Sequence, residues 1–222
     1  MTPPLVLLHP LGVDHHFWDP IRPYFQPAVV TPDLDGSTVE EMADAVLAGL
    51  STPVDVTGVS LGGLVAQVIA ARRPDLVRRL VLADTVAVYP EAMRTMWRER
   101  ASLVRREGLT PILAPTEALW FPSAVPPPVR ARLRSLLSAG DPERYARACE
   151  ALAVADTTAT AAALTMPVLL ACGQDDAPPF RQAVGWFGVT LPDATVAWLP
   201  GGHGTAFEHP DEFAEAVSAF LY

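Results

Sequence analysis

The sequence predicts an α/β fold: a doubly wound, mostly parallel sheet with helices on both faces. Short apolar runs alternate with longer segments of helical pattern along the 222 residues, and several runs end in loops that carry glycine or acidic residues. Parallel strands that are buried on both faces are apolar throughout, and this alternation is typical of them. Hydrophobic residues make up 50% of the chain, which is sufficient for one substantial core.

The first elements follow from two apolar runs and a set of capping residues. Leu5–Leu8 and Ala28–Pro32 predict two buried strands. The segment Ser37-Thr38-Val39-Glu40-Glu41 then offers hydroxyl and carboxylate groups at the spacing of a capping box. We therefore expect a helix over Thr38–Leu50.

A serine stands at the junction of the next strand and helix. Val54–Val59 predicts the third strand, and Leu61–Arg72 has a helical pattern. Glycines at positions 58, 62 and 63 permit a strained turn that moves the Ser60 hydroxyl clear of the sheet edge. Ser60 is therefore a candidate nucleophile, and the N–H of Leu61 is a candidate donor to an oxyanion.

After the fourth expected strand, Leu80–Ala83, the pattern changes. Residues 88–163 contain helix-favouring segments and no strand signal. We expect a helical insertion over 88–163, with the core formed by 1–87 and 164–222. The proline-rich stretch Phe121–Pro128 predicts an extended connector inside the insertion. The helices expected in the insertion are Glu91–Glu107, Val129–Ala139 and Pro142–Ala153.

The last two expected strands end in loops whose residues can serve the serine. Val168–Cys172 opens into Asp175 and Asp176, and Thr195–Leu199 runs into a glycine-rich loop that carries His203. A serine nucleophile on this scaffold needs an acid and then a histidine later in the chain. We expect His203 to be the base and one of the two aspartates to orient it. The helices expected here are Phe180–Phe187 and Pro210–Leu221.

The loop after the first strand is the expected source of a second oxyanion donor. It reads His9-Pro10-Leu11-Gly12, and Leu11 is the candidate because Pro10 has no N–H and Gly12 permits the turn. We expect His9 to bond the loop backbone, since His203 already fills the role of base.

Composition narrows the classes of partner and cofactor. The net charge of −9 disfavours binding to nucleic acid or to an anionic membrane surface. All 16 basic residues are arginine, and the absence of lysine excludes Schiff-base chemistry. Cys149 and Cys172 form no metal-binding motif, and we expect both to pack as small apolar side chains. No metal or organic cofactor is expected. With no signal peptide or membrane span visible, we expect a cytoplasmic monomer or homodimer.

These motifs resemble the α/β-hydrolase family and, within it, the branch that contains 3-oxoadipate enol-lactonases. The resemblance covers nearly the whole chain and includes His9-Pro10-Leu11-Gly12, the serine turn, Gly173-Gln174-Asp175-Asp176 and the His203 loop. It implies an α/β-hydrolase core with a helical cap over the active site. It also implies that the acid is Asp176 rather than Asp175, and that Trp120 and Phe121 line the substrate pocket.

The chain departs from the family pattern in three places. Relatives usually have a hairpin ahead of the first strand, and only four residues precede Leu5 here, so we expect a sheet shortened at that edge. The loop after Gly36 is shorter than usual, which predicts a more open pocket mouth. Leu119 stands where the family often has a basic residue.

Other large or charged residues of the insertion have simpler interpretations. Trp97 and Tyr145 are expected to hold the insertion's helices together. Arg130, Arg132 and Arg134 alternate along one helix, and a solvated face is expected for all three.

The predicted function is hydrolysis of an ester or lactone bond in a small organic substrate through Ser60, Asp176 and His203. Two alternatives stay open at this point. The same pocket could serve as a C–C bond hydrolase, cyclase or lyase on a pathway intermediate, or the chain could be a non-catalytic ligand-binding protein of the same fold.

Overall fold

A single parallel sheet organises the computed structural model, which describes residues 3–25 and 28–222. The strand order is β2-β1-β3-β4-β5-β6, and every neighbouring pair is parallel, which confirms the predicted α/β class. The strands are β1 (Leu5–Leu8), β2 (Val29–Val30), β3 (Val54–Val59), β4 (Val77–Ala83), β5 (Val168–Gly173) and β6 (Ala194–Leu199). The helices are α1 (Val39–Leu47), α2 (Leu61–Arg72), α3 (Glu91–Glu107), α4 (Thr110–Trp120), α5 (Pro127–Ala139), α6 (Pro142–Val154), α7 (Thr158–Ala162), α8 (Pro178–Thr190), α9 (Thr205–Glu208) and α10 (Pro210–Leu221).

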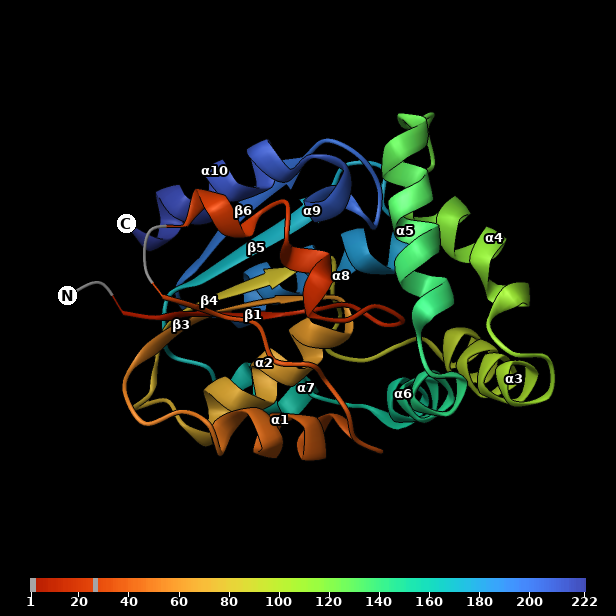
Figure 1. Ribbon diagram of the computed structural model, residues 1–222. Helices are drawn as coiled ribbons and strands as arrows, with labels where there is room; N and C mark the ends of the chain where they lie inside the picture. The colour runs from red at the N-terminus through yellow and green to blue at the C-terminus, as the bar shows by residue number, and fades with distance from the viewer. Residues whose placement is uncertain (1–2, 26–27) are drawn as a thin grey trace.

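Two apolar cores lie on opposite faces of this sheet. Successive side chains of a strand point to opposite faces, so Leu5 and Leu7 of β1 join one core while Val6 and Leu8 join the other. Helices α1, α2 and α8 cover the face of Val6, and α10 covers the other, with the 3₁₀ turn His15–Trp18 beside it. Figure 1 shows α1 and α2 below the sheet and α10 above it. The sheet is therefore doubly wound, as predicted.

The helix after β2 begins as its capping residues predict. The Thr38 side chain accepts from the N–H of Glu41 at 3.1 Å, and the Glu41 carboxylate accepts from the N–H of Ser37 at 2.7 Å. The first of these bonds satisfies an N–H group that the first helical turn leaves without a partner. The return bond reaches Ser37, one residue ahead of the N-cap.

Helices α3 to α6 form a separate group beyond the carboxyl ends of the strands. They lie together at the right-hand side of Figure 1, toward which the strand arrows point. Contacts between α3 and α6 and between α4 and α5 hold the group together. The short helix α7 instead contacts α2 and α8. The predicted insertion therefore needs correction at its end, because residues 158–162 pack on the core.

Three element predictions were wrong in detail. The strand expected over Ala28–Pro32 is shorter than predicted, because only its residues Val29–Val30 (β2) pair with β1. No strand precedes β1 in the described residues, so β2 forms the edge of the sheet. Helix α4 was not predicted, because Pro115 lies inside it. The connector expected up to Pro128 ends early, since Pro127 and Pro128 begin α5, where a missing N–H costs nothing.

Candidate active site

A strained turn between β3 and α2 presents Ser60. Its backbone has φ 54° and ψ −111°, a conformation that L-residues rarely adopt. A Cβ on Gly62 would lie 2.2 Å from the carbonyl oxygen of Leu8, so only glycine lets α2 start this close to β1. Ser60 is 5% exposed and makes no capping bond with its own side chain. Its hydroxyl is therefore free to bond another group.

His203 joins the serine to an acid. Its Nε2 lies 3.0 Å from Ser60 Oγ, and its Nδ1 lies 3.0 Å from Asp176 Oδ2. His203 comes from the loop between β6 and α9, and Asp176 from the loop between β5 and α8. All three side chains are buried. The structure thus brings together the three residues that the sequence singled out from separate strand ends.

The two neighbouring aspartates have different surroundings. Asp176 is 1% exposed, and its second carboxylate oxygen accepts from the N–H of Ala177 at 2.6 Å. Asp175 is exposed, and its backbone N–H donates to the carbonyl of Gly201. The geometry therefore agrees with the choice of Asp176 that the family resemblance implied.

A second buried carboxyl, which the sequence analysis missed, lies beside Asp176. Asp84 follows β4 with φ 45°, and its Oδ1 accepts from the N–H of Gly173 at 2.8 Å. Burial and then the charge of Asp176 raise the pKa of Asp84 well above its usual range. Atoms of Asp84, Asp176 and Cys172 lie within 4.8 Å of one another, a grouping that could hold a cation. The other oxygen of Asp84, Oδ2, is buried and has no hydrogen-bond partner among the described residues, which agrees with a carboxyl whose charged form is disfavoured.

The loop between β1 and the first 3₁₀ turn is fixed by His9. The ring Nδ1 lies 2.8 Å from the carbonyl oxygen of Pro10, and Nε2 accepts from the N–H of Leu34 at 2.9 Å. The first of these bonds confirms the expectation that the His9 side chain bonds to the backbone of the loop. Neither Leu11 nor Leu61 is among the donors in the backbone hydrogen bonds of the described residues. Both N–H groups are therefore available to a ligand.

The cavity at Ser60 is small. Its volume is about 20 Å³, and its lining comes from the strand-end loops and from α3, α4 and α6. A larger cavity of about 250 Å³ lies beside it and shares Leu11 and Tyr145, but neither Ser60 nor His203 lines it. The smaller cavity is therefore the candidate reaction site because Ser60 lines it, although the neighbouring cavity is larger. The smaller cavity is lined by Pro10, Leu11, Ser60, Trp97, Arg100, Thr116, Leu119, Trp120, Tyr145 and His203.

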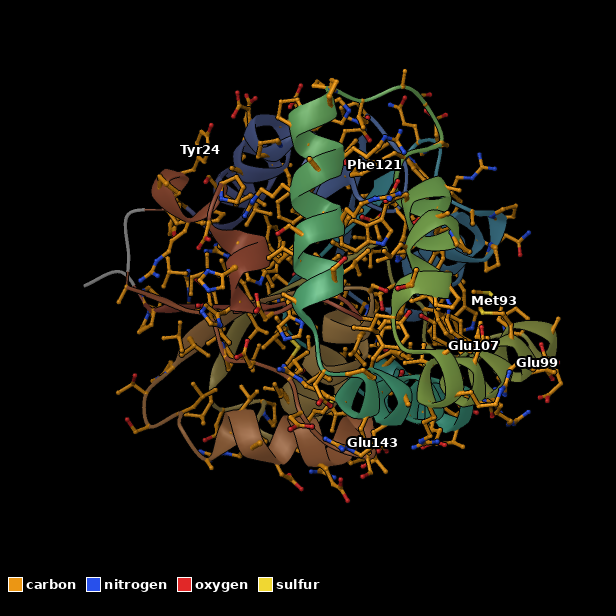
Figure 2. All side chains as sticks on the ribbon, turned by 45° about the vertical axis from the view of Figure 1, so that its right-hand side comes forward. Tyr24, Met93, Glu99, Glu107, Phe121 and Glu143 are labelled. Atoms are coloured by element: carbon orange, nitrogen blue, oxygen red, sulfur yellow. The ribbon has the colours of Figure 1, made fainter. Side chains whose placement is uncertain are left out.

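The prediction of which residues of the insertion line the pocket needs revision. Trp120 lines the Ser60 cavity, and its carbonyl accepts from the N–H of Gly204, next to His203. Phe121 is not among the lining residues and packs against Phe207, where α4 ends beside α5 (Figure 2). Trp97 and Tyr145, expected only to pack, both line the cavity.

The arginines of α5 do not all extend into solvent, contrary to the prediction of a solvated face. Arg130 and Arg134 both pair with Glu117, which is buried on α4, with N–O distances of 3.3 and 2.7 Å. The guanidinium of Arg132 lies 4.8 Å from the ring centre of Phe207. These arginines therefore bind α5 to its neighbours.

Residues 5–216 match the sequence model of the alpha/beta hydrolase family. The chain belongs to this family. It is 31% identical to 3-oxoadipate enol-lactonase 2 of Acinetobacter baylyi, with 99% of the chain and 88% of the relative covered. It is 32% identical to a pimeloyl-[acyl-carrier protein] methyl ester esterase of Aromatoleum aromaticum, over 97% of the chain and 96% of the relative. The enol-lactonase structure from Burkholderia xenovorans superposes with a TM-score of 0.88 at 25% identity, covering 100% of the chain and 92% of that structure.

These likenesses confirm the predicted family, the hydrolase class and the enol-lactonase-like relatives. Cys149 and Cys172 are free and buried, as expected. In the part of the chain that the structure describes, no helix is both long and apolar enough to cross a bilayer.

Proposed function

We propose that this alpha/beta hydrolase cleaves an ester or lactone of a small organic substrate through Ser60, His203 and Asp176. The observation that carries the proposal is the unbroken chain of contacts, 3.0 Å from Ser60 Oγ to His203 Nε2 and 3.0 Å from His203 Nδ1 to Asp176. A serine hydroxyl becomes nucleophilic when a positioned imidazole takes its proton, and the imidazole needs a fixed acceptor at its other nitrogen.

The reaction follows from these positions. His203 removes the Ser60 proton as Oγ attacks the carbonyl carbon, and the carbonyl oxygen takes the negative charge between the Leu11 and Leu61 N–H groups. His203 then gives the proton to the leaving alkoxide, which departs from the acyl-enzyme. Water attacks by the same route, and cleavage of the Ser60 ester releases the acid. Asp176 holds the imidazole orientation and stabilises its cation throughout.

Helices α3 to α6 serve in this proposal as the cap that selects the substrate. They cover the strand ends where Ser60 lies, and Trp120 connects α4 to the His203 loop. Two relatives are named for a lactone and for a methyl ester. Both substrates contain a carbonyl bonded to an oxygen leaving group, which supports this bond class. A cytoplasmic location and action without a cofactor remain part of the proposal.

The test is turnover of a panel of 4-nitrophenyl esters and simple lactones by the wild type, Ser60→Ala and His203→Ala. Each substitution should lower kcat by at least about 10⁴-fold without lowering Tm, because members of such a unit act together. Ser135→Ala, an exposed serine on α5, is the matched control and should retain wild-type rates. Retained turnover in Ser60→Ala would reject the nucleophile and favour cyclase or lyase chemistry.

A further inference from the structure

We infer that Arg100 and Trp97 of α3 form a carboxylate-binding subsite in the Ser60 cavity, so that the substrate is an ester or lactone that carries a free carboxylate. This inference rests on the proposed function and narrows its substrate class. The supporting observation is that both side chains line the cavity and carry hydrogen-bond donors that face no anionic partner among the described residues.

Among the described residues, Arg100 is the one permanently charged side chain that lines that cavity. It makes no ion pair among the described residues, and its single hydrogen bond is a long one of 3.4 Å from Nη2 to Thr116 Oγ1. A guanidinium has five N–H donors in a fork that matches a carboxylate. Most of these donors are therefore available to a ligand.

Trp97 supplies a second, independent observation. It stands one helical turn before Arg100 on α3, lines the same cavity and is 5% exposed. Its indole N–H is buried and has no hydrogen-bond partner among the described residues. A buried donor without an acceptor is unfavourable, and an acceptor on a bound substrate would satisfy it. The Arg100 guanidinium lies 5.6 Å from the Trp97 ring centre, so both donors belong to one patch.

The outer side of Arg100 borders another cavity, which gives a substrate a route to it. This outer cavity, about 450 Å³, lies between α3 and α4 and includes Met96, Leu103 and Ile112 in its lining. Arg100 lines both cavities. Glu99, which is labelled in Figure 2, also lines this outer cavity from α3. A carboxylate that enters along the outer cavity would meet the guanidinium before its ester group reaches Ser60.

The charges around Arg100 agree with an anionic ligand. Glu99 shares the outer cavity, but no ion pair joins it to Arg100 among the residues described. Glu150 of α6 is already bound to Arg105, and Glu117 to the α5 arginines. Because the protein as a whole carries a charge of −9, an anionic substrate needs a local cation to be held. Arg100 is placed for that role.

The experiment compares two esters that differ in one charge: mono-4-nitrophenyl adipate and its methyl ester. Arg100→Met should lower kcat/KM for the anionic ester about ten- to hundredfold, mainly through KM, because it removes a charge-assisted contact. The neutral ester should change by less than about threefold. Arg100→Lys should recover part of the loss. Arg98→Met removes an exposed arginine of the same helix, which pairs with Glu91, and should affect neither ester.

A binding measurement covers the case in which Arg100→Met folds poorly. Adipate dianion should inhibit hydrolysis of the neutral ester competitively in the wild type and at least about tenfold less well in Arg100→Gln. Equal effects of Arg100 substitutions on both esters, or unchanged inhibition, would overturn the subsite. Hydrolysis that persists in Ser60→Ala would instead reject the proposed function, whatever Arg100 does, so the two failures are distinguishable.

Discussion

Asp175 and Asp176 are adjacent in sequence, yet only Asp176 reaches His203, at 3.0 Å. An asparagine at position 176 offers an N–H where the ring needs an acceptor, which favours the wrong imidazole tautomer. Asp176→Asn should therefore lower kcat by about 10⁴-fold, the loss known for such a change in other triads. Asp175→Asn, at an exposed position, is the matched control and should change kcat by less than about threefold. Equal losses at pH 7 in steady-state kinetics would show that the acid is wrongly assigned.

His9 gives the fold a pH dependence of known sign. Burial lowers the pKa of His9 from 6.5 to about 4, so between these values the unfolded chain binds a proton that the folded chain does not. The stability that this provides is complete above pH 6.5 and is lost as pH falls toward 4, a change of about 3 kcal/mol.

His9→Asn should therefore be less stable than the wild type at pH 7, with a difference that shrinks steadily toward pH 4. Urea unfolding at intervals between pH 7 and pH 4 measures it. His16→Asn, an exposed histidine, provides the control and should leave the pH profile of the wild type unchanged. A constant difference between wild type and His9→Asn over this range would contradict the assigned neutral state of His9.

Local pattern was enough to single out Ser60 and His203 as candidates, because each lies in a glycine-rich segment next to an apolar run. The choice of Asp176 needed the family resemblance. Arg100 and Asp84 were missed, since neither stands in a recognisable motif and each acquires its surroundings only when distant segments meet. Trp97 and Tyr145 were assigned to packing for the same reason.

The junction of β1, β3 and α2 depends on close contact between backbones. A Cβ at Gly62 would lie 2.2 Å from the Leu8 carbonyl oxygen, a contact that neither backbone can relieve without moving the turn. Gly62→Ala should lower the free energy of unfolding by at least about 2 kcal/mol and reduce activity with it. Gly185→Ala, in α8 with open space around the added carbon, should stabilise by about 0.5–1 kcal/mol. Thermal unfolding of the two variants gives both values, and a neutral Gly62→Ala would contradict the proposed turn geometry.

Among the elements, those with clear periodicity were predicted closely and those with conflicting signals were not. The helix expected at Leu61–Arg72 is α2 to the residue, and Glu91–Glu107 is α3. Helix α4 escaped prediction because Pro115 breaks its pattern, yet packing against α3 and α5 maintains it. The edge strand β2 has two residues, and both pair with β1.

In the whole molecule, the apolar cores on the two faces of the sheet continue into the inserted helices, since both include residues of α3 to α6. Two apolar cores hold the sheet between helical layers, while α3 to α6 stand beyond the strand ends over Ser60. The mostly parallel sheet with helices on both faces was predictable from alternation alone. The donors that face the cavity from α3 were not, because they depend on how the inserted helices pack on one another and on the core.

The central claim is that Ser60 forms a covalent acyl-enzyme during ester hydrolysis. The most direct measurement is intact-protein mass after acid quench, taken within the first turnovers of a 4-nitrophenyl ester, followed by peptide mapping. Acyl transfer through Ser60 predicts a mass increase equal to the acyl group on the peptide that contains Ser60, and no such adduct in Ser60→Ala. Rapid turnover by Ser60→Ala, or an acyl group located on another residue, would contradict it.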